Sequence, residues 1–256
     1  MTKITQQTEI LNRIKTQSWN HKLTVDADPN KKWFSISQVI NALTKPFDEV
    51  AVATRCAEKA TPGSKYWGMS VDEIIASWKL KASVAADRGM GLDTYIQSVL
   101  HDKPKPLIDD PILQKKCAQF DLFKEKCLDA VPGIQFVGSE IWLNSEKFGI
   151  RGRLDALFVM GEHLIIFDWK NNDEFKVNTF EKMEGPCDFL PTSDINKFTI
   201  QLYGYKYFLQ EEFGMSVKSV RVVQFTQDVY TIHKPTFEYR KDFMEEVFNY
   251  AIGKLL

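Results

Sequence analysis

Apolar residues occur in continuous or alternating runs in the second half of the chain, and these runs predict β-strands. The run at 164–167 is apolar at every position and leads directly into Asp168, which is typical of a strand buried on both faces. Residues 160–163 contain a glycine between two such runs and predict a hairpin turn. The expected strands are 134–143, 149–160, 164–170, 217–225 and 229–232.

Other parts of the chain show apolar residues at the spacing of amphipathic helices. Ser70 is a candidate N-cap, and Glu73 stands three residues later, at the spacing of a capping box. Two glycines within 88–91 predict a break in the helix that follows. The chain from 33 to 40 is expected to begin extended and to turn into a short helix. The longer expected helices are 71–100 with that break, 112–130, 194–213 and the residues from 239 onward.

This order of elements predicts an α+β fold, with a mixed central sheet flanked by helices. We expect a single domain over residues 1–256, because the chain contains no internal repeat and no low-complexity tract. Residues 1–130 form its mainly helical part, and residues 131–256 form its sheet-containing core. A chain of 256 residues with 44% hydrophobic content is long enough to bury one substantial core.

The chain carries 33 basic and 34 acidic side chains, for a net charge of −1. This balance argues against a strongly basic protein that coats nucleic acid, but it allows a DNA enzyme whose acids gather at a metal site. Four cysteines are widely spread without a close pair, as is typical of reduced thiols. No apolar segment approaches the roughly 18 residues of a membrane span, so we expect a cytoplasmic protein with no membrane partner.

Asp155, Asp168 and Lys170 are the candidate reactive groups. Side chains alternate along a strand, so Asp168 and Lys170 are expected to project together while Trp169 turns to the other face. Two acids and an ammonium at the end of a buried strand are costly unless they bind a metal or take part in chemistry. Mg²⁺ or Mn²⁺ held by carboxylates, with a lysine beside them, meets the needs of phosphodiester hydrolysis. We therefore expect a centre of one or two ions with Asp155, Asp168 and the Trp169 carbonyl as ligands and Lys170 as the electrophilic group.

Charged side chains on the two preceding strands are further candidates. Glu140 is a candidate third carboxylate ligand, with a solvated strand edge as the alternative. Arg151 and Arg153 are expected on the strand face of Asp155, where they would clamp phosphate groups. Ordinary surface charge explains the two arginines equally well.

A later helix adds polar candidates on one face. Gln201 and Tyr205 are four residues apart, and Lys197 lies one turn earlier. An amide and a phenol in these positions would orient the DNA backbone or the attacking water. Such a pair alone is weak support, because amphipathic helices produce it often.

Three segments together resemble the G-x-x-D, D-x-K and Q-x-x-x-Y motifs of RecB-like nucleases, which belong to the PD-(D/E)XK superfamily. These segments are 152–155, 168–170 and 201–205. The Asp-Trp-Lys sequence and the twelve residues between the two aspartates are most similar to mitochondrial genome maintenance exonucleases and related phage exonucleases. Upstream, 34–40 is similar to the family's S-V-T-x-V-L opening, and 86–93 is similar to its R-G-T-x-x-H helix. The resemblance spans residues 34–210.

The resemblance implies a restriction-endonuclease-like mixed sheet, divalent metal ions and a DNA substrate with a free end. It puts Asp93 where the family has a metal-binding histidine, and an aspartate also suits Mg²⁺ or Mn²⁺. Ser35, Ser37 and Arg88 lie in the two upstream segments and are candidate DNA contacts. Some RecB-like nucleases hold an iron–sulfur cluster through one early and three late cysteines. No cysteine follows Cys187 here, so no such cluster is expected.

In the mitochondrial relatives a single strand passes through an arch formed by the helical N-terminal part. Four aromatic residues of this chain lie in that part and are candidates for stacking on unpaired bases, with a place in the core as the alternative. They are Tyr66, Trp67, Trp78 and Tyr95.

These observations predict a metal-dependent DNA exonuclease that acts on single-stranded or frayed ends in replication, recombination or repair. It would work beside other proteins of those processes, in a phage- or virus-infected cell. Two alternatives stay open. A structure- or sequence-specific endonuclease would use the same metal centre, and a catalytically silent nucleic-acid-binding module would explain the aspartate at position 93.

Overall fold

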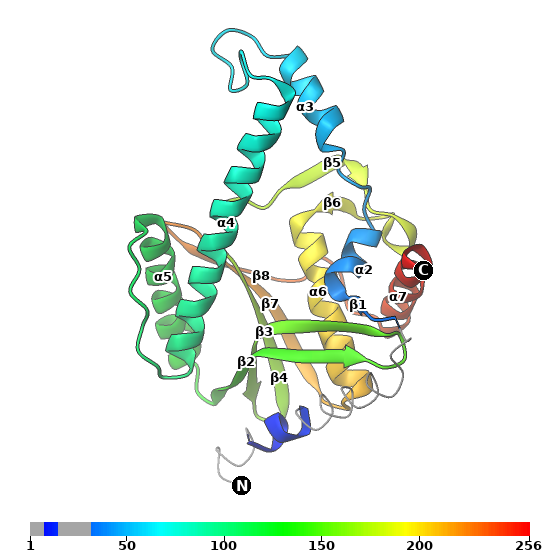
Figure 1. The fold of residues 1–256 in the computed structure, drawn as a ribbon. Helices are drawn as coiled ribbons and strands as arrows, with labels where there is room; N and C mark the ends of the chain where they lie inside the picture. Colours follow the sequence, from blue (N-terminus) through cyan, green and yellow to red (C-terminus); the bar gives the residue numbers. More distant parts are fainter. Residues whose placement is uncertain (1–7, 15–31) are drawn as a thin grey trace.

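The chain forms a mixed β-sheet with helices on both faces, and a helical arm projects from it (Figure 1). This computed structural model describes residues 8–14 and 32–256, and it has the predicted α+β architecture. The strands are β1 (Phe34–Ser35), β2 (Ile134–Ser145), β3 (Ile150–Met160), β4 (His163–Lys170), β5 (Val177–Lys182), β6 (Pro191–Ser193), β7 (Val217–Phe225) and β8 (Tyr230–His233). The labelled α-helices are α2 (Ile36–Ala42), α3 (Glu49–Glu58), α4 (Val71–Leu100), α5 (Pro111–Phe123), α6 (Asp194–Tyr207) and α7 (Lys241–Leu255).

Shorter helical segments complete this list. Residues 8–14 are helical, and a 3₁₀ turn spans Gly185–Cys187. π-Helical turns at Lys124–Asp129 and Phe208–Glu212 extend α5 and α6. The five strands expected from the sequence and the helices expected near 112–130, 194–213 and 239 therefore all exist, with ends that differ by a few residues.

Along one of its two edges, strand β3 pairs with two different strands, β1 and β4. The sheet order is β1-β3-β4-β7-β8, and β2 pairs with β3 along its full length. On the edge opposite β2, β4 pairs with residues 156–160 and β1 pairs with residues 150–151. Residues 152–155 lie between them and pair with none of the described strands on that edge. On this edge, residues 152–155 therefore have backbone groups that are not used in pairing with the described strands.

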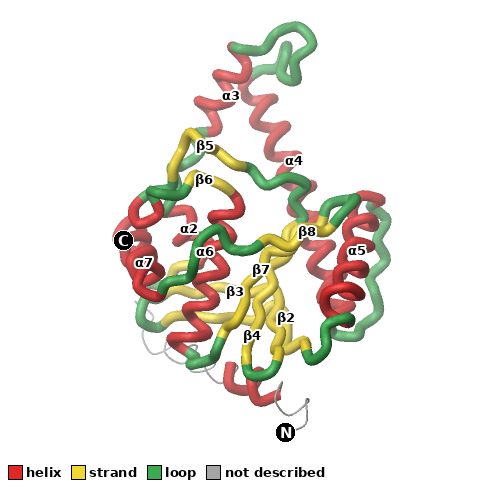
Figure 2. Tube along the Cα trace, turned by 180° about the vertical axis from the view of Figure 1, so that it is seen from behind, coloured by secondary structure: helices red, strands yellow, loops and turns green. Residues whose placement is uncertain are grey.

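Each face of the sheet carries its own hydrophobic core. One core joins the sheet to α2, α6 and α7, with Ile166, Ile200 and Phe248 fully buried. The other joins it to α5 and the C-terminal half of α4, with Phe120 and Phe123 fully buried. From behind, α5 stands on one side of the strands and α6 and α7 on the other (Figure 2).

Helix α4 is continuous, and the predicted break at 88–91 is wrong. The predicted capping box is present, since Ser70 accepts from Glu73 N and the Glu73 side chain accepts from Ser70 N. Both glycines of 88–91 keep helical φ angles and allow close approach instead. A Cβ on Gly91 would lie 2.5 Å from Leu113 Cδ2 of α5, and one on Gly89 would lie 3.3 Å from Asn171 Nδ2.

The N-terminal half of α4 and helix α3 form the arm (Figure 1). Residues 79–87 are exposed on every side of the helix. At the tip, Ile74 and Ala53 are fully buried between the two helices. The arm is thus a small packed tip joined to the body by a solvent-exposed helical span.

Helix α3 and strands β5 and β6 were not predicted from the sequence, and neither were the helix at 8–14 and the 3₁₀ turn. Helix α3 buries only Ala53 and begins at Asp48, whose carboxylate accepts from Ala51 N at 2.9 Å. Strands β5 and β6 form a separate two-stranded sheet, and β5 is exposed along most of its length. Helix α3 has an amphipathic pattern of small side chains that was overlooked, whereas the exposed β5 leaves little hydrophobic alternation to detect.

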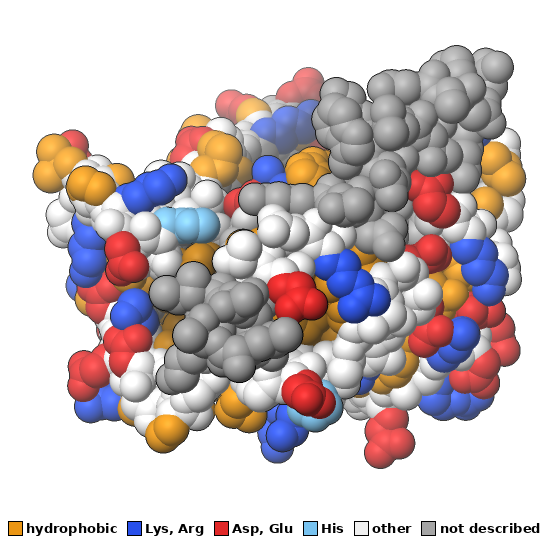
Figure 3. All heavy atoms as spheres, turned by 90° about the horizontal axis from the view of Figure 1, so that it is seen from below, with side chains coloured by type: hydrophobic (Ala, Val, Ile, Leu, Met, Phe, Trp, Pro, Cys, Tyr) orange, Lys and Arg blue, Asp and Glu red, His pale blue; other side chains and the backbone are white. Residues whose placement is uncertain are grey.

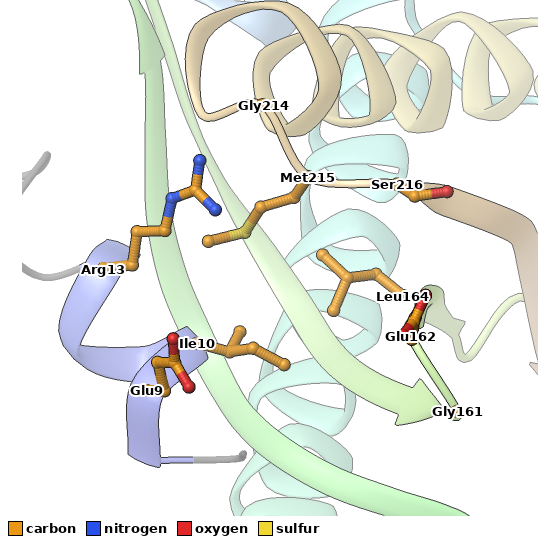
Figure 4. Close-up of a pocket in the computed structure, with 9 residues that line it drawn as sticks. All are labelled: Glu9, Ile10, Arg13, Gly161, Glu162, Leu164, Gly214, Met215 and Ser216. Atoms are coloured by element: carbon orange, nitrogen blue, oxygen red, sulfur yellow. The ribbon is translucent and has the colours of Figure 1, made fainter.

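A cavity of about 720 Å³ lies at the start of β4. Asp168 and Lys170 lie at the opposite end of that strand and do not line the cavity. The side chains of Ile10, Leu164 and Met215 surround it (Figure 4). On the lower face of the described surface, basic and acidic side chains are interspersed (Figure 3), in keeping with the balanced net charge. Within the described part of the chain, no helix is long and apolar enough to cross a membrane.

Candidate metal centre

The last residues of β4 are arranged as the alternation of strand side chains predicts. Asp168 is fully buried, and its Oδ2 lies 2.6 Å from Lys170 Nζ. Trp169 turns to the other face, where it stacks on Phe167 and packs edge-on against Phe123. The carboxylate and the ammonium therefore share one face of β4, under α6.

Asp155 joins this pair from β3. Its Oδ2 accepts a hydrogen bond of 2.8 Å from Trp169 N, at the point where the β3–β4 ladder ends. Burial, followed by the charge of Asp168, raises the pKa of Asp155 well above its usual range. Burial acts to lower the pKa of Lys170, but the charges of Asp168 and Asp155 outweigh it and raise that pKa. The three predicted reactive groups thus form one electrostatic unit.

The alternation of β3 is interrupted next to Asp155. Leu157 packs in the core under α6, so the odd-numbered residues face α6 in that half of the strand. Gly152 also faces α6, because a Cβ on it would lie only 2.7 Å from Tyr205 Cε1. Even-numbered residues thus face α6 at Gly152, and odd-numbered residues face α6 at Leu157. Asp155 lies between these two positions, where the alternation changes.

On β2, the regular pairing with β3 is interrupted at Glu140. It stands opposite Asp155 in the register, but it has a φ of +55° and is left out of the ladder. A non-glycine residue in this conformation costs about 1 kcal/mol or more and is most common at functional sites. The Glu140 carboxylate forms an ion pair of 2.7 Å with Arg153 Nε.

The two arginines of β3 are placed differently from the prediction. Because the alternation changes, Arg151 and Arg153 do not share the face of Asp155. Arg153 is kept near the acid cluster by Glu140, and its guanidinium lies 5.8 Å from the ring centre of Trp142. Arg151 is exposed further along the strand.

Helix α4 brings Asp93 to the same cluster. Burial, followed by the charge of Glu140, raises the pKa of Asp93 to about 6. Lys170, Asp168 and Arg153 also contribute to this pKa, so the side chain lies within electrostatic range of both strands. Asp93 therefore lies within electrostatic range of Glu140, Asp155 and Asp168, although no three such side chains of the described residues form a group that could hold a metal ion.

The polar side chains of α6 form hydrogen bonds with β3 and with one another. The Tyr205 hydroxyl donates to the carbonyl of Arg153 at 2.8 Å, in the split edge of β3, and accepts from Gln201 Nε2 at 3.2 Å. Tyr205 is buried, and burial raises its pKa. The predicted contact of Tyr205 with DNA is therefore wrong. Gln201 is half-buried beside it, and Lys197 is half-buried one turn earlier.

Two other predicted DNA contacts have structural partners. Arg88 forms an ion pair of 2.7 Å with Asp110, the N-cap residue of α5, and so ties α4 to α5. Ser35 caps α2, since its hydroxyl accepts from Gln38 N at 3.1 Å. Ser37 is exposed on the first turn of α2.

The four aromatic candidates divide between core and arm. Tyr95 is buried, and its hydroxyl donates to Asp121 at 2.7 Å, so the expected stacking role for it is wrong. Trp78 Nε1 donates to the Tyr66 hydroxyl at 2.8 Å at the tip of the arm. Trp67 stays 56% exposed.

The donor atoms of this cluster suit a divalent cation. The Oδ1 atom of Asp168 is buried and has no hydrogen-bond partner among the described residues, whereas Oδ2 lies 2.6 Å from the Lys170 ammonium. Buried oxygens of this kind are costly unless a cation compensates them. As they lie, no three His, Cys, Asp or Glu side chains of residues 8–14 and 32–256 form a complete ligand set. Asp155 and Asp168 would hold the ion, with the remaining ligands supplied by Asp93, Glu140, a carbonyl or water.

Two side chains near the centre were missed by sequence reasoning. The ring of Phe198 on α6 lies 4.7 Å from Lys170 Nζ and covers its ammonium. Lys116 on α5 is buried and contacts the segment that follows Lys170. Neither residue belongs to a motif, and only the tertiary fold brings them there.

Comparisons with known proteins give no family for the chain. No family model matches it, and no curated protein matches it. Among solved structures, one described as the crystal structure of SSO0001 aligns with 97% of this chain and 85% of its own length. Its sequence identity is 12% and its TM-score is 0.35, a likeness that supports no conclusion about function.

Proposed function

We propose that the chain is a Mg²⁺- or Mn²⁺-dependent DNA exonuclease of the PD-(D/E)XK type, in one domain with a helical N-terminal part. It would hydrolyse phosphodiester bonds at single-stranded or frayed ends during replication, recombination or repair. The observation that carries the proposal is the unit of Asp155, Asp168 and Lys170, in which the buried Oδ1 of Asp168 has no hydrogen-bond partner among the described residues. The ion pair with Lys170 satisfies only Oδ2 of Asp168, and the buried Oδ1 stays available to a cation.

The residues present suit hydrolysis of a phosphodiester. A divalent cation bound there would lower the pKa of a coordinated water and offset the charge of the phosphoryl oxygens. Asp155 and Asp168 would hold it, and the bond from Trp169 N keeps the Asp155 carboxylate in a fixed orientation. Lys170 stays charged, because the two aspartates raise its pKa, and so it would stabilise negative charge on the phosphate.

Substitution of two of these residues tests the proposal. Asp155→Asn keeps an acceptor for Trp169 N but removes a charge that would hold the ion, and Lys170→Ala removes the ammonium. Both variants should lose cleavage of end-labelled oligonucleotides while they keep their circular dichroism spectrum and their affinity for DNA. Lys115→Ala, at an exposed position of α5, is the control. Cleavage at the parental rate by either variant would show that the site is assigned wrongly.

The topology of the substrate separates exonuclease from endonuclease. An exonuclease should leave circular single-stranded DNA intact while it degrades the linear form. Cleavage of circles at a similar rate would establish an endonuclease with the same centre.

A catalytically silent nucleic-acid-binding module is the second candidate function. The incomplete ligand set of the described residues is the observation that favours it. Calorimetric titration with Mn²⁺ decides between the two. An active centre should bind Mn²⁺ in a manner that Asp155→Asn abolishes, whereas a silent module should bind none through these carboxylates.

A further inference from the structure

A buried lysine lies close behind the candidate centre. Lys116 of α5 is only 3% exposed, and its ammonium donates to the carbonyl of Asn171. It also forms an ion pair of 2.8 Å with Asp173, whose side chain remains 63% exposed. A buried ammonium is expensive and contributes little stability even when it is paired, so a role beyond folding is a reasonable inference.

Lys116 acts on the three residues that directly follow Lys170. This segment, 171–173, is held by other elements as well. Gln224 of β7, the register partner of Lys170, donates to the carbonyl of Asn172 at 2.8 Å. Three consecutive residues are thus held through their carbonyl and carboxylate groups by side chains from α5 and β7.

The same segment reaches α4, the helix that carries Asp93. Asn171 Nδ2 donates to the carbonyl of Ala85 at 2.9 Å, and the absence of a side chain at Gly89 makes room for it. The end of β4 and the middle of α4 are therefore connected through Asn171. We call the contacts of Lys116 with Asn171 and Asp173 the clamp. The clamped segment starts at the residue after Lys170, and it meets α4 at Ala85 and Gly89, about two turns and one turn before Asp93.

We propose that Lys116 is a positioning residue that fixes the end of β4 and, with it, the ammonium of Lys170 relative to the carboxylates. The inference rests on the proposed function. Displacement of a reacting group by about 1 Å costs up to about a hundredfold in rate. The contacts of Lys116 should therefore affect kcat and leave the affinity for the metal ion unchanged.

Lys116→Met tests this role, because methionine keeps most of the apolar stem. The fold should persist, because Asp173 is 63% exposed and its carboxylate stays solvated when the ammonium is removed. We expect kcat on a linear oligonucleotide to fall about tenfold or more, while KM and Mn²⁺ affinity change by less than about twofold. Lys115→Met, at the exposed neighbouring position, is the control and should change none of these. A parental kcat, or a loss of Mn²⁺ affinity equal to the loss of kcat, overturns the proposal.

A second variant and a second measurement keep the test independent of folding and of the proposed function. Asp173→Asn removes the surface half of the clamp and should lower kcat in the same direction, by less. Amide exchange of 171–173 should rise in Lys116→Met and stay parental in Lys115→Met. If the parental chain neither cleaves DNA nor binds Mn²⁺, the proposed function fails. The exchange result then decides alone whether Lys116 holds this segment, and equal exchange in all three proteins refutes the clamp.

Discussion

At the scale of single residues, Asp155 and Asp168 oppose folding. The buried Asp168 and the half-buried Asp155 share one ammonium, and burial followed by the charge of Asp168 disfavours the ionised form of Asp155 by raising its pKa. Proteins retain such groups where function requires them. The cluster should therefore destabilise the chain without metal ions and stabilise it with them.

Removal of one charge should reveal this cost. In the presence of EDTA, Asp155→Asn should raise the free energy of unfolding by about 1 kcal/mol, since asparagine still accepts from Trp169 N. Added Mn²⁺ should then stabilise the parental chain and leave the variant unchanged. Urea denaturation with EDTA and with Mn²⁺ measures both effects. A variant less stable than its parent in EDTA would show that the carboxylates do not repel each other.

The pKa of Asp93 predicts a pH dependence with a definite sign. A carboxyl whose pKa is raised to about 6 in the folded chain, from 3.8, holds its proton more tightly than in the unfolded chain. Stability contributed by this group is present below pH 4 and is lost as the pH rises to 6. Without metal ions, Asp93→Asn should therefore gain stability relative to the parent over that interval. Urea midpoints at pH 4, 5 and 6 test this, and a constant difference would contradict it.

Local patterns in the sequence predict some of these residues and not others. Alternation along the strand correctly placed Asp168 with Lys170, because β4 is regular to its end. The same rule failed for Arg153, because the inward-facing positions of β3 change next to Asp155. A left-handed Glu140 stands opposite this change on the neighbouring strand, and no local pattern reveals either irregularity.

At the scale of elements, hydrophobic periodicity predicted the regular strands and most helices, but it misjudged glycine. Gly89 and Gly91 were expected to end a helix, and they instead let Asn171 and Leu113 approach α4. Their role depends on neighbours far away in the chain. Gly152 is a third case, since it lies between Tyr205 and Ile36, where the edge of β3 opposite β2 pairs with none of the described strands.

Alanine substitutions at two glycines should have opposite effects. In Gly152→Ala the new Cβ would lie 2.7 Å from Tyr205 Cε1 and 2.9 Å from Ile36 Cγ2. We expect a loss of about 1 to 3 kcal/mol from this overpacking. Gly253→Ala, in α7 with open space around it, should gain up to about 1 kcal/mol from helix propensity. Thermal unfolding of both variants checks the contrast, and similar midpoints would contradict it.

At the scale of the whole molecule, one helix joins the arm to the body. Residues 79–87 of α4 are all exposed and bury no apolar side chain, and they contain several strong helix formers. Their order depends on intrinsic propensity and on the anchored segments at both ends.

Weakening of this span should stay local. Ala82→Gly should cost about 1 kcal/mol of helix stability and speed amide exchange across 79–87 about fivefold. The global unfolding midpoint should hardly change, since no core packing is lost. Ala118→Gly, on the exposed side of the packed helix α5, is the control and should lower the global midpoint instead. Equal effects on the midpoint would show that the span is part of the cooperative core.

The divided edge of β3 has a consequence for the order of folding. Strands β2, β3 and β4 follow one another along the chain, so Asp155 and Asp168 can meet through short loops while water still surrounds them. Strand β1 and helix α4 come from much earlier residues and close over that region only through distant contacts. We expect the electrostatic penalty to fall on the final steps of folding, and Mn²⁺ to accelerate them. Refolding rates that are the same with Mn²⁺ and with EDTA would disprove this order.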